Sequence, residues 1–563
     1  MSREAAAVTP LYPVSGERGR PSRVVLVAPA SVPGWLRAFR DLAVRTGWID
    51  LVLVSGFDVP APDFEEIGFD MRLFLALERV VHRNANTSLE PEVIAREPPA
   101  YHAQGALERL LEQVQALSPD VVLLIGPQAW AARLAPLARL GCWHLDASLV
   151  DPRYAGLSLA GSVLRADPAT RVELVLQDAD GVETVLAGSS SRTRLPSFLM
   201  TRNDAFSKLP QLLLRGLLRV ASSTSTSTTS TSTGSWQARQ PVTLKLSPRA
   251  PSGSNEGLRL LLATSLAKVR SLVRRFKYQG WAIVVRRNPE PLDPYAPVIG
   301  SHTVLEAAEG WWADPCVVLD GARTLVFVEE MDLATNRALI ACVELYEGGV
   351  RRLGTALSEP GHLSFPQVFA WQEHWYMTVE TGYARRASLY RAVDFPLQWV
   401  RVRDLVTGWS CVDPVLHHHD GHWYLFVNVA ENGEGTSDDL FLFVAESLEG
   451  PYTPHPASPL VCDVRRARMA GRLFHHRGRL IRPSQDCGPN YGAAVVFNEV
   501  LELGPQVYRE RPLSRLAPDW GPALHGCHTY SAGGGCEVLD VAGRPPAGSV
   551  RLRLFDGGRT EAS

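Results

Sequence analysis

Three segments in the second half of the chain repeat one pattern of apolar and polar positions. Each begins with an Xaa-Pro pair, continues as a short apolar strand, turns at polar residues, and ends as an aromatic or aliphatic strand closed by a polar residue. The segments are 313–330, 364–380 and 412–428, and a looser fourth copy covers 470–486. Such a unit is too small to bury its own face, so it must stack beside copies of itself. The irregular spacing predicts an all-β propeller of five blades over residues 279–542.

The first half of the chain follows a different pattern. Short aliphatic runs at 24–28, 51–54 and 120–125 alternate with helix-like periodicity at 35–43, 106–117 and 130–140. A hairpin is expected at 171–177 and 184–188, and helical spacing returns from Phe198 to Leu218. This alternation predicts an α/β layered domain with a mostly parallel sheet over residues 23–221. The fold class is therefore multidomain, with an α/β domain followed by the propeller.

Polar segments separate and flank these domains. Residues 1–22 and 543–563 are expected to be tails, and the Ser/Thr-rich stretch 222–256 is expected to be a flexible linker. Residues 257–278 predict an amphipathic helix in which leucine and valine alternate with lysine and arginine. A basic amphipathic helix can lie on a membrane surface or pack on its own domain, and both readings stay open.

Composition narrows the function classes. The net charge of −2 and the charged content of 21% give no strong attraction to nucleic acid. No apolar run approaches the roughly 20 residues of a membrane span, and the N-terminus has no signal-peptide pattern, which predicts a cytoplasmic protein. The eight cysteines form no Cys-x-x-Cys pair, so we expect reduced core thiols and no metal site.

The segment after the strand expected near residue 142 is where such sheets bind ligands. It reads His144-Leu145-Asp146-Ala147-Ser148 and continues to a Tyr154-Ala155-Gly156 turn. On these residues, the chain from about 23 to 220 resembles the folate-dependent formyltransferases, which carry an Asn-x-His pair, a Ser-Leu run and a catalytic Asp. His144 stands where that family has Asn, and Asp146 where it has His. Ser148 and Tyr154 match, and Asp178 or Asp180 takes the place of the family's Asp with a shifted register.

The resemblance implies formyl transfer to an amino sugar with 10-formyltetrahydrofolate, provided that the altered site is active. Formyl transfer needs a proton acceptor and a donor for the oxyanion, and an ionised Asp146 cannot donate. His144 could take that role. The alternatives are a repurposed scaffold and a purely structural hydrogen bond between His144 and Asp146.

The propeller half, residues 279 to about 542, resembles the N-terminal propeller of plant glucosamine inositolphosphorylceramide transferases and is similar to five-bladed arabinanase- and xylosidase-type glycosidases. The matching pieces include Ala313-Asp314-Pro315, Leu363-Ser364-Phe365-Pro366, Asp413-Pro414, Ala470-Gly471-Arg472 and Gly526-Cys527-His528. The plant glycosyltransferase domain has no counterpart in this sequence. The resemblance therefore implies a sugar nucleotide or a glycan as the partner without naming an activity.

By analogy with those glycosidases, Asp314 would be the base, Glu380 the acid and Asp413 a charged neighbour at one mouth of the ring. Arg468, Arg472, Gln485, Asp486 and His528 are the candidate sugar-binding residues. Alternatively, an Asp-Pro pair at a blade start is a structural turn, in which Asp caps and Pro sets the strand entry. Two function classes remain, namely a carbohydrate-modifying enzyme and a non-catalytic sugar-binding protein.

Overall fold

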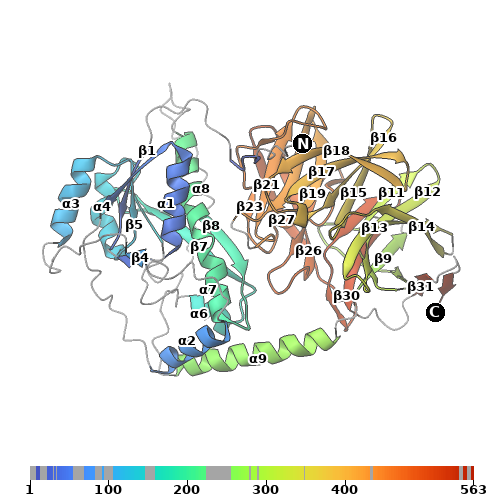
Figure 1. The fold of residues 1–563 in the computed structure, drawn as a ribbon, viewed down its shortest axis with the longest axis horizontal. Coiled ribbons are helices and arrows are strands. Elements are labelled where there is room, and N and C mark those ends of the chain that lie inside the picture. The colour runs from blue at the N-terminus through green and yellow to red at the C-terminus, as the bar shows by residue number, and fades with distance from the viewer. Residues whose placement is uncertain are drawn as a thin grey trace. The chain divides into compact units, whose positions relative to one another are not determined.

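The computed structural model divides the chain into two compact units, residues 15–272 and residues 1–14 with 273–563 (Figure 1). Each unit is described by itself. The described residues are 8–12, 22–29, 31–32, 34–54, 69–82, 92–93, 106–145, 159–223, 255–277, 280–287, 291–307, 309–347, 349–431, 435–543, 550–554 and 560–562. The Ser/Thr-rich linker predicted at 222–256 lies almost entirely outside them.

The first unit is built on a six-stranded sheet of order β3-β1-β5-β6-β7-β8. The first four strands of this order run parallel, and β7 and β8 form an antiparallel hairpin at one edge. The α/β layering and the mostly parallel sheet are therefore as predicted. The strands are β1 (Ser22–Val27), β3 (Ile49–Val54), β5 (Val121–Leu124), β6 (Cys142–His144), β7 (Ala169–Gln177) and β8 (Glu183–Arg192), and β2 (Ser31–Val32) pairs separately with β4 (Glu92–Val93).

Apolar runs and apolar spacing explain these elements. The inner strand β1 is buried on both faces and carries an unbroken aliphatic sequence, as central parallel strands do. Helix α1 buries Trp35, Leu36, Phe39 and Ala43 and ends at Gly47, whose φ of 70° forms the left-handed cap that glycine adopts without strain. The other helices are α2 (Phe69–Val81), α3 (Ala106–Leu117), α6 (Ala160–Leu164), α7 (Phe198–Phe206), α8 (Leu209–Ser223) and α9 (Glu256–Lys277), and α1 spans Trp35–Thr46.

One predicted helix is wrong. The stretch 130–140 forms three short turns instead, namely η1 (Gln128–Trp130), α4 (Ala131–Leu134) and η2 (Ala135–Leu137). Pro136 lies at the start of the last turn, and a proline inside a helix removes a backbone donor and clashes with the preceding turn. Helix α9 is as predicted to within a residue at each end.

The second unit is a five-bladed propeller, because strand pairing within the described residues forms five separate blades, which are antiparallel except for one parallel pair in the fifth. The first blade contains β11 (Trp311–Asp320), β12 (Arg323–Asp332), β13 (Arg337–Tyr346) and β14 (Gly349–Leu357), and the second contains β15 (Ser364–Trp371), β16 (His374–Glu380), β17 (Arg386–Asp394) and β18 (Gln398–Thr407). The third contains β19 (Cys411–His419), β20 (His422–Val429), β21 (Asp439–Ala445), β22 (Thr453–Pro454) and β23 (Val461–Cys462). The fourth contains β24 (Phe474–His476), β25 (Arg479–Asp486), β26 (Ala494–Leu503) and β27 (Tyr508–Leu516).

The fifth blade joins the two ends of the propeller sequence. Strand β30 (Cys536–Gly543) pairs antiparallel with β9 (Trp281–Arg287), as predicted for the strand that closes the ring. Across this seam, the buried side chains of Arg286 and Glu537 form an ion pair, and Glu537 also accepts from the Tyr530 hydroxyl at 2.6 Å. The blade also contains β10 (Thr303–Glu306), β28 (Leu524–Gly526), β29 (Tyr530–Gly533), β31 (Val550–Leu554) and β32 (Thr560–Ala562).

The fourth and fifth blades meet at Gly471, whose φ is 141°. A Cβ there would overlap the carbonyl oxygen of Tyr530. We expect Gly471→Ala to lower the free energy of unfolding by about 2–3 kcal/mol, through overpacking and backbone strain. Gly504→Ala is the control, because its Cβ would meet only a Val507 methyl at 3.4 Å. Chemical denaturation measures both, and equal stability of the two variants would contradict the close contact.

The ends of the chain add to the propeller unit. Within the predicted tail 1–22, residues 8–12 pack on the propeller, where the Thr9 amide donates to the Thr407 carbonyl oxygen at 3.0 Å and Tyr12 donates to Glu431 at 2.5 Å. Near the other end, β31 pairs in parallel with β10. All eight cysteines are free thiols, and seven of them are buried, as expected for core residues.

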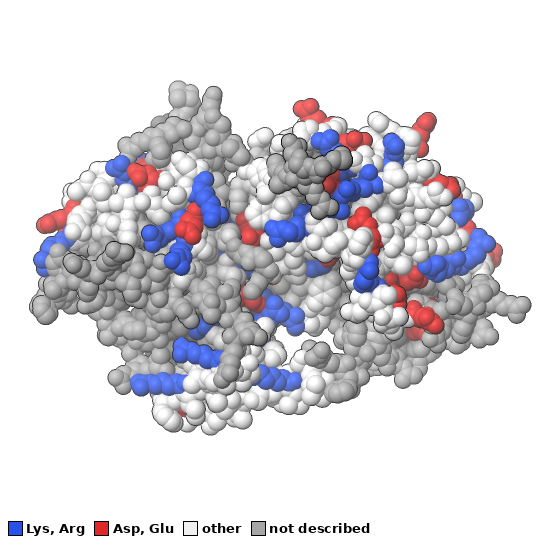
Figure 2. All heavy atoms as spheres, in the orientation of Figure 1, with Lys and Arg blue, Asp and Glu red and all other residues white. Residues whose placement is uncertain are grey.

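Charge is mixed over the propeller face drawn in Figure 2, where Lys and Arg atoms lie among Asp and Glu atoms. This agrees with the net charge of −2 for the chain. Among the described helices, none combines the length and the apolar character that crossing a membrane requires.

Candidate functional site

The same backbone irregularity occurs at the start of three consecutive blades. Asp314, Phe365 and Asp413 each precede a proline and have φ values of 49°, 51° and 49°. At each of them the pairing of the first strand with the second shifts register, as in a β-bulge. Left-handed backbone is costly for residues other than glycine and tends to occur at functional sites. At the bulges, Asp314 and Asp413 therefore depart from the alternating side-chain pattern of their strands, and the two aspartates occupy equivalent positions in their blades.

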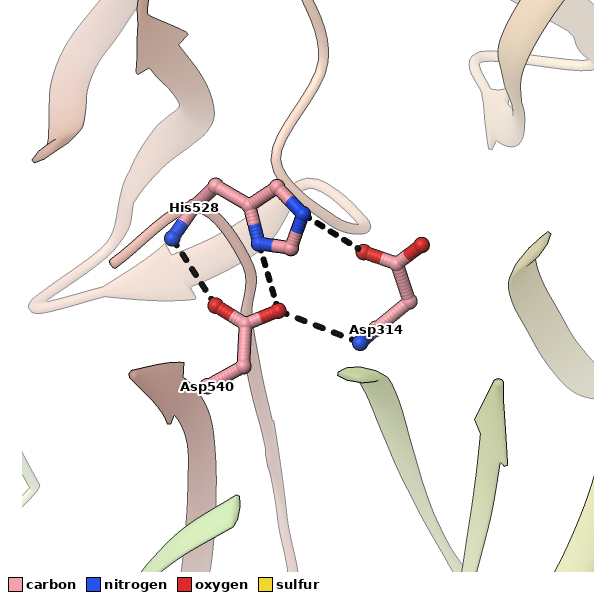
Figure 3. Close-up of side chains that lie close together, drawn as sticks. All are labelled: Asp314, His528 and Asp540. Carbon is pink, nitrogen blue, oxygen red and sulfur yellow. Dashed lines mark hydrogen bonds and ion pairs between the residues drawn. The ribbon is translucent and has the colours of Figure 1, made fainter. Parts of the chain in front are cut away.

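Asp314 lies in a buried network with the fifth blade (Figure 3). Its backbone amide donates to Asp540 Oδ2 at 3.1 Å, and its own carboxylate accepts from the Thr529 hydroxyl at 2.7 Å. The Phe365 amide donates to Asp314 Oδ2 at 3.1 Å, which links the first blade to the second. His528 Nδ1 lies 2.5 Å from Asp540 Oδ2, and His528 Nε2 lies 3.5 Å from Asp314 Oδ1.

The charges in this network favour a protonated histidine. Burial lowers the pKa of His528, but the charges of Asp540 and Asp314 outweigh burial and raise that pKa to about 9. For Asp540, burial alone would raise the pKa. The nearby His528 cation acts in the opposite direction and, with the hydrogen bonds that Asp540 accepts, outweighs burial, so the pKa of Asp540 is lowered overall. Trp281 stacks on the imidazole with ring centroids 4.0 Å apart. At neutral pH, His528 is therefore a fixed cation between two carboxyl groups.

The same three residues form one group of possible metal ligands in the described part of the chain, with one atom from each of Asp314, His528 and Asp540 lying within 4.8 Å of the others. Their ligand atoms already bind one another, and a histidine ligates a metal only through a deprotonated nitrogen. The raised pKa of His528 favours its protonated form, so a cation would have to displace that proton, and the contacts present are those of an ion-paired network.

His528 makes stability depend on pH. Its folded pKa of about 9 lies above the unfolded value of 6.5, so its contribution is complete below pH 6.5 and is lost as pH rises to about 9. We expect a loss of about 3 kcal/mol over that window. Thermal unfolding measured at several pH values checks this. Buried carboxyl groups with raised pKa values act in the same direction, so His528→Asn isolates the histidine, and an equally steep pH profile in that variant would contradict the assignment.

A second charged group lies around Asp413. Arg468 donates from Nε to Asp413 Oδ2 at 2.6 Å and from Nη2 to Asp413 Oδ1 at 3.3 Å, which is a two-point contact. The same Nη2 donates to Glu380 Oε2 at 3.2 Å. Gln485 Nε2 donates to Asp413 Oδ2 at 3.0 Å, and the Arg468 guanidinium lies 4.9 Å from the centre of the Tyr491 ring. One arginine thus binds two carboxyl groups from adjacent blades.

Two glutamates near these groups have raised pKa values, which favour the neutral, protonated form of the side chain. Burial raises the pKa of Glu380 well above its usual range, and Asp413 raises it further against the opposing effect of Arg468. Burial and the Asp314 charge raise the pKa of Glu329 in the same way. The Glu380 side chain is 19% exposed, whereas Asp413 is buried. The raised pKa favours the protonated form of Glu380, and solvent can reach this carboxyl group, as a general acid requires.

The structure brings together most of the predicted propeller residues. Asp413, Glu380, Arg468 and Gln485 contact one another, and Asp314 contacts His528. Burial raises the pKa of Asp314, and the charges of Asp540 and Asp413 raise it further against the opposing effect of His528, so that Asp413 connects the two groups electrostatically. Asp486 and Arg472 make other contacts, since Asp486 accepts from Arg515 Nε at 2.8 Å and Arg472 Nη1 donates to the Val368 carbonyl oxygen at 3.0 Å.

The formyltransferase-type residues are described only in part. His144 ends β6 and is buried, with Nε2 3.6 Å from Glu183 Oε1. Asp180 is exposed in the β7–β8 turn, where its amide donates to Asp178 Oδ1 at 3.0 Å. Asp146, Ser148 and Tyr154 lie outside the described residues. Formyl transfer and the folate cofactor therefore stay predictions.

The sequence reasoning missed four residues of the propeller site, namely Asp540, Glu329, Thr529 and Trp281. Asp540 and Glu329 had a detectable signal, because each is an acid within a mainly apolar strand. Gln367 was missed as well. It is buried on β15, and neither its amide oxygen nor its nitrogen has a hydrogen-bond partner among the described residues.

Most of the strands around this site fall within one region of sequence similarity. Residues 292–517 match the sequence model of the family described as glucosamine inositolphosphorylceramide transferase 1, N-terminal. Glucosamine inositolphosphorylceramide transferase 1 of Oryza sativa subsp. japonica is 30% identical over 258 residues, covering 43% of this chain and 34% of the relative. The Arabidopsis thaliana protein of that name is 32% identical over 203 residues, covering 35% and 26%. The chain thus spans about a third or less of these relatives, and the propeller resemblance to glucosamine inositolphosphorylceramide transferases is confirmed.

Solved structures with a similar fold include a family 117 glycoside hydrolase of the marine bacterium Zobellia galactanivorans, with 10% identity, a TM-score of 0.31, and coverage of 47% of this chain and 90% of that one. A GH43 enzyme from Xanthomonas citri complexed with xylose has 14% identity, a TM-score of 0.31, and coverage of 45% and 90%.

Proposed function

We propose that the propeller binds a sugar beside Glu380 and Arg468, and that Glu380 donates a proton to the glycosidic oxygen in a transfer or hydrolysis reaction. The observation that carries this proposal is the contact of the solvent-accessible Glu380, whose pKa is raised by burial, with the buried Arg468–Asp413 ion pair. Glycosidic chemistry uses one protonated and one ionised carboxyl group on either side of the bond.

Each residue has a distinct role in this proposal. Arg468 fixes the Glu380 carboxyl group by donating to Oε2, and Asp413 holds the arginine in place. Negative charge on Asp413 also keeps the Glu380 proton in place. Asp314 is the proposed base, held by Thr529 and by the His528–Asp540 pair. Tyr491 is 43% exposed beside Arg468 and offers a ring surface on which a sugar can stack.

The sugar class follows from the names of the relatives, which specify glucosamine and a phosphoinositol lipid. We therefore propose an amino sugar as the ligand. A non-catalytic sugar-binding role for the same residues is the second candidate, because both oxygens of Asp314 already accept hydrogen bonds.

A two-part experiment tests the proposal. Saturation-transfer NMR with glucosamine, inositol phosphate, xylose and arabinose detects binding, and nitrophenyl glycosides of glucosamine, xylose and arabinose report turnover. Binding together with turnover supports the enzyme, and binding without turnover supports the second candidate. The absence of binding to every sugar in the panel would contradict both.

A further inference from the structure

Helix α9 is attached to its domain by the side that carries few large apolar residues. Its buried positions are Gly257, Leu260 and Thr264. The Gly257 amide donates to Asp70 Oδ2 of α2 at 2.8 Å, and Lys268 Nζ lies 3.7 Å from Glu78 Oε1, about three turns further along α9 and two turns further along α2. The two helices therefore run side by side in the same direction.

The apolar stripe of α9 faces solvent. Its members are spaced three or four residues apart, so they share one face of the helix, and each is between 49% and 62% exposed. They are Leu258, Leu262, Leu266, Val269 and Leu272. At 100° per residue, this face is opposite the face that holds Leu260 and Thr264. The usual arrangement, in which a surface helix buries its apolar stripe, is thus reversed.

Helix α2 repeats this reversal. Its apolar residues Phe69, Leu73, Leu77 and Val80 are 41–81% exposed, again at spacings of three and four. Its buried side holds Met71, Phe74 and Glu78 instead. Glu78 is fixed there by the Ser197 hydroxyl at 2.6 Å and by the Leu199 amide at 3.1 Å. The outward direction of the stripe is therefore set by specific contacts on the opposite side.

Basic residues flank the stripe of α9. The helix sequence contains six lysines and arginines against one acid, Glu256. Arg259 and Arg270 are exposed about 100° from the centre of the stripe, and Lys268 lies on the other flank. Lys and Arg atoms are visible along α9 in Figure 2, beside uncharged atoms. Exposed apolar residues with basic residues on their flanks are the pattern of helices that lie in a lipid interface.

Charge also distinguishes the candidate occupants of this face. A second copy of the chain would bring the same basic helix against itself, and like charges at a two-fold interface repel. An anionic bilayer offers both an apolar layer for the leucines and phosphate groups for the flanking bases. We propose that the stripes of α9 and α2 form a docking surface for an anionic membrane, on which α9 lies parallel to the bilayer plane.

Vesicle flotation of the full chain tests this proposal. The wild type is expected to float with phosphatidylcholine vesicles that contain phosphatidylglycerol, and much less with phosphatidylcholine alone. Leu262→Glu/Leu266→Glu is expected to weaken flotation about tenfold or more, because both side chains would insert a charge into the apolar layer. These positions are exposed in the structure, so the fold should tolerate the change.

The matched control is Val182→Glu/Val185→Glu in the β7–β8 hairpin of the same unit, where exposure is similar at 56% and 43%. This control should float like the wild type. Arg259→Glu/Arg270→Glu should lose the preference for phosphatidylglycerol. Failure of the wild type to float, or unchanged flotation of the Leu262/Leu266 variant, would overturn the proposal. So would a wild-type dimer that binds no vesicles and dissociates in that variant, since the face would then bind a second copy.

Discussion

Replacing Arg468 with alanine is expected to lower the free energy of unfolding by about 3–5 kcal/mol. Arg468 is buried and binds Asp413 at two points and Glu380 at a third. Its removal leaves the Asp413 carboxylate buried without a cation in contact among the described residues, although Gln485 Nε2 still donates to it. An unpaired buried charge costs far more than the net contribution of the pair, because its lost hydration is no longer offset.

Urea denaturation followed by tryptophan fluorescence measures the effect. Arg465→Ala is the matched control, because Arg465 also makes a two-point contact, with Asp463, but is 50% exposed, and its loss should cost no more than about 1 kcal/mol. Adding Asp413→Asn to Arg468→Ala should recover part of the stability by removing the orphaned charge. A double variant less stable than Arg468→Ala alone would contradict the ion-pair explanation.

Replacing Glu380 with glutamine is expected to reduce turnover of the glycoside identified by the sugar panel by about 10²–10⁴-fold. Glutamine still accepts from Arg468 but carries no transferable proton. The loss should be larger for an alkyl glycoside than for a nitrophenyl glycoside, because a poor leaving group depends more on protonation. Since burial and Asp413 raise the pKa of Glu380, wild-type activity should persist well above the usual glutamate range and then fall as pH increases. Initial rates across pH measure both effects.

Glu330→Gln is the control for this variant. Glu330 is also 19% exposed and lies in the corresponding strand of the preceding blade, but it binds Arg352 on an outer strand. It should retain the wild-type rate. Equal rates for Glu380→Gln and the wild type, with both proteins folded, would remove Glu380 from the acid role and favour the non-catalytic alternative.

The local sequence pattern was sufficient to predict the propeller fold. It was not sufficient to predict the contacts between charged residues at the centre of the propeller. Xaa-Pro followed by two short strands predicted the blades, and the apolar strand at Cys536 predicted the seam with Trp281. The pairing of Arg468 with Glu380 joins residues 88 positions apart, and His528 meets Asp314 across more than 200. No periodicity encodes such contacts, because they depend on how the blades stack. The left-handed backbone of Asp314 and Asp413 was equally invisible, since Asp-Pro alone is compatible with an ordinary turn.

In the α/β unit, the sequence predicted the sheet but misjudged individual helices. Pro136 breaks the helix expected at 130–140, and α2 was missed although Phe69, Leu73 and Leu77 have helical spacing. For α9, the sequence left open whether its apolar stripe packs on the domain or faces outward. The answer depended on Gly257 and Asp70, whose contact fixes the rotation of the helix about its axis.

The pairing of β9 with β30 also means that two neighbouring strands of one blade are synthesised at very different times. The Arg286–Glu537 pair joins residues 251 positions apart, so β9 emerges from the ribosome long before the strand that covers its edge. The sheet of the α/β unit is complete in sequence by Arg192, and four blades follow β9 before β30 is made. During that interval the nascent propeller is an open arc with an unpaired apolar edge. Emergence of β30, rather than the folding of any single blade, is the event that removes this edge from solvent.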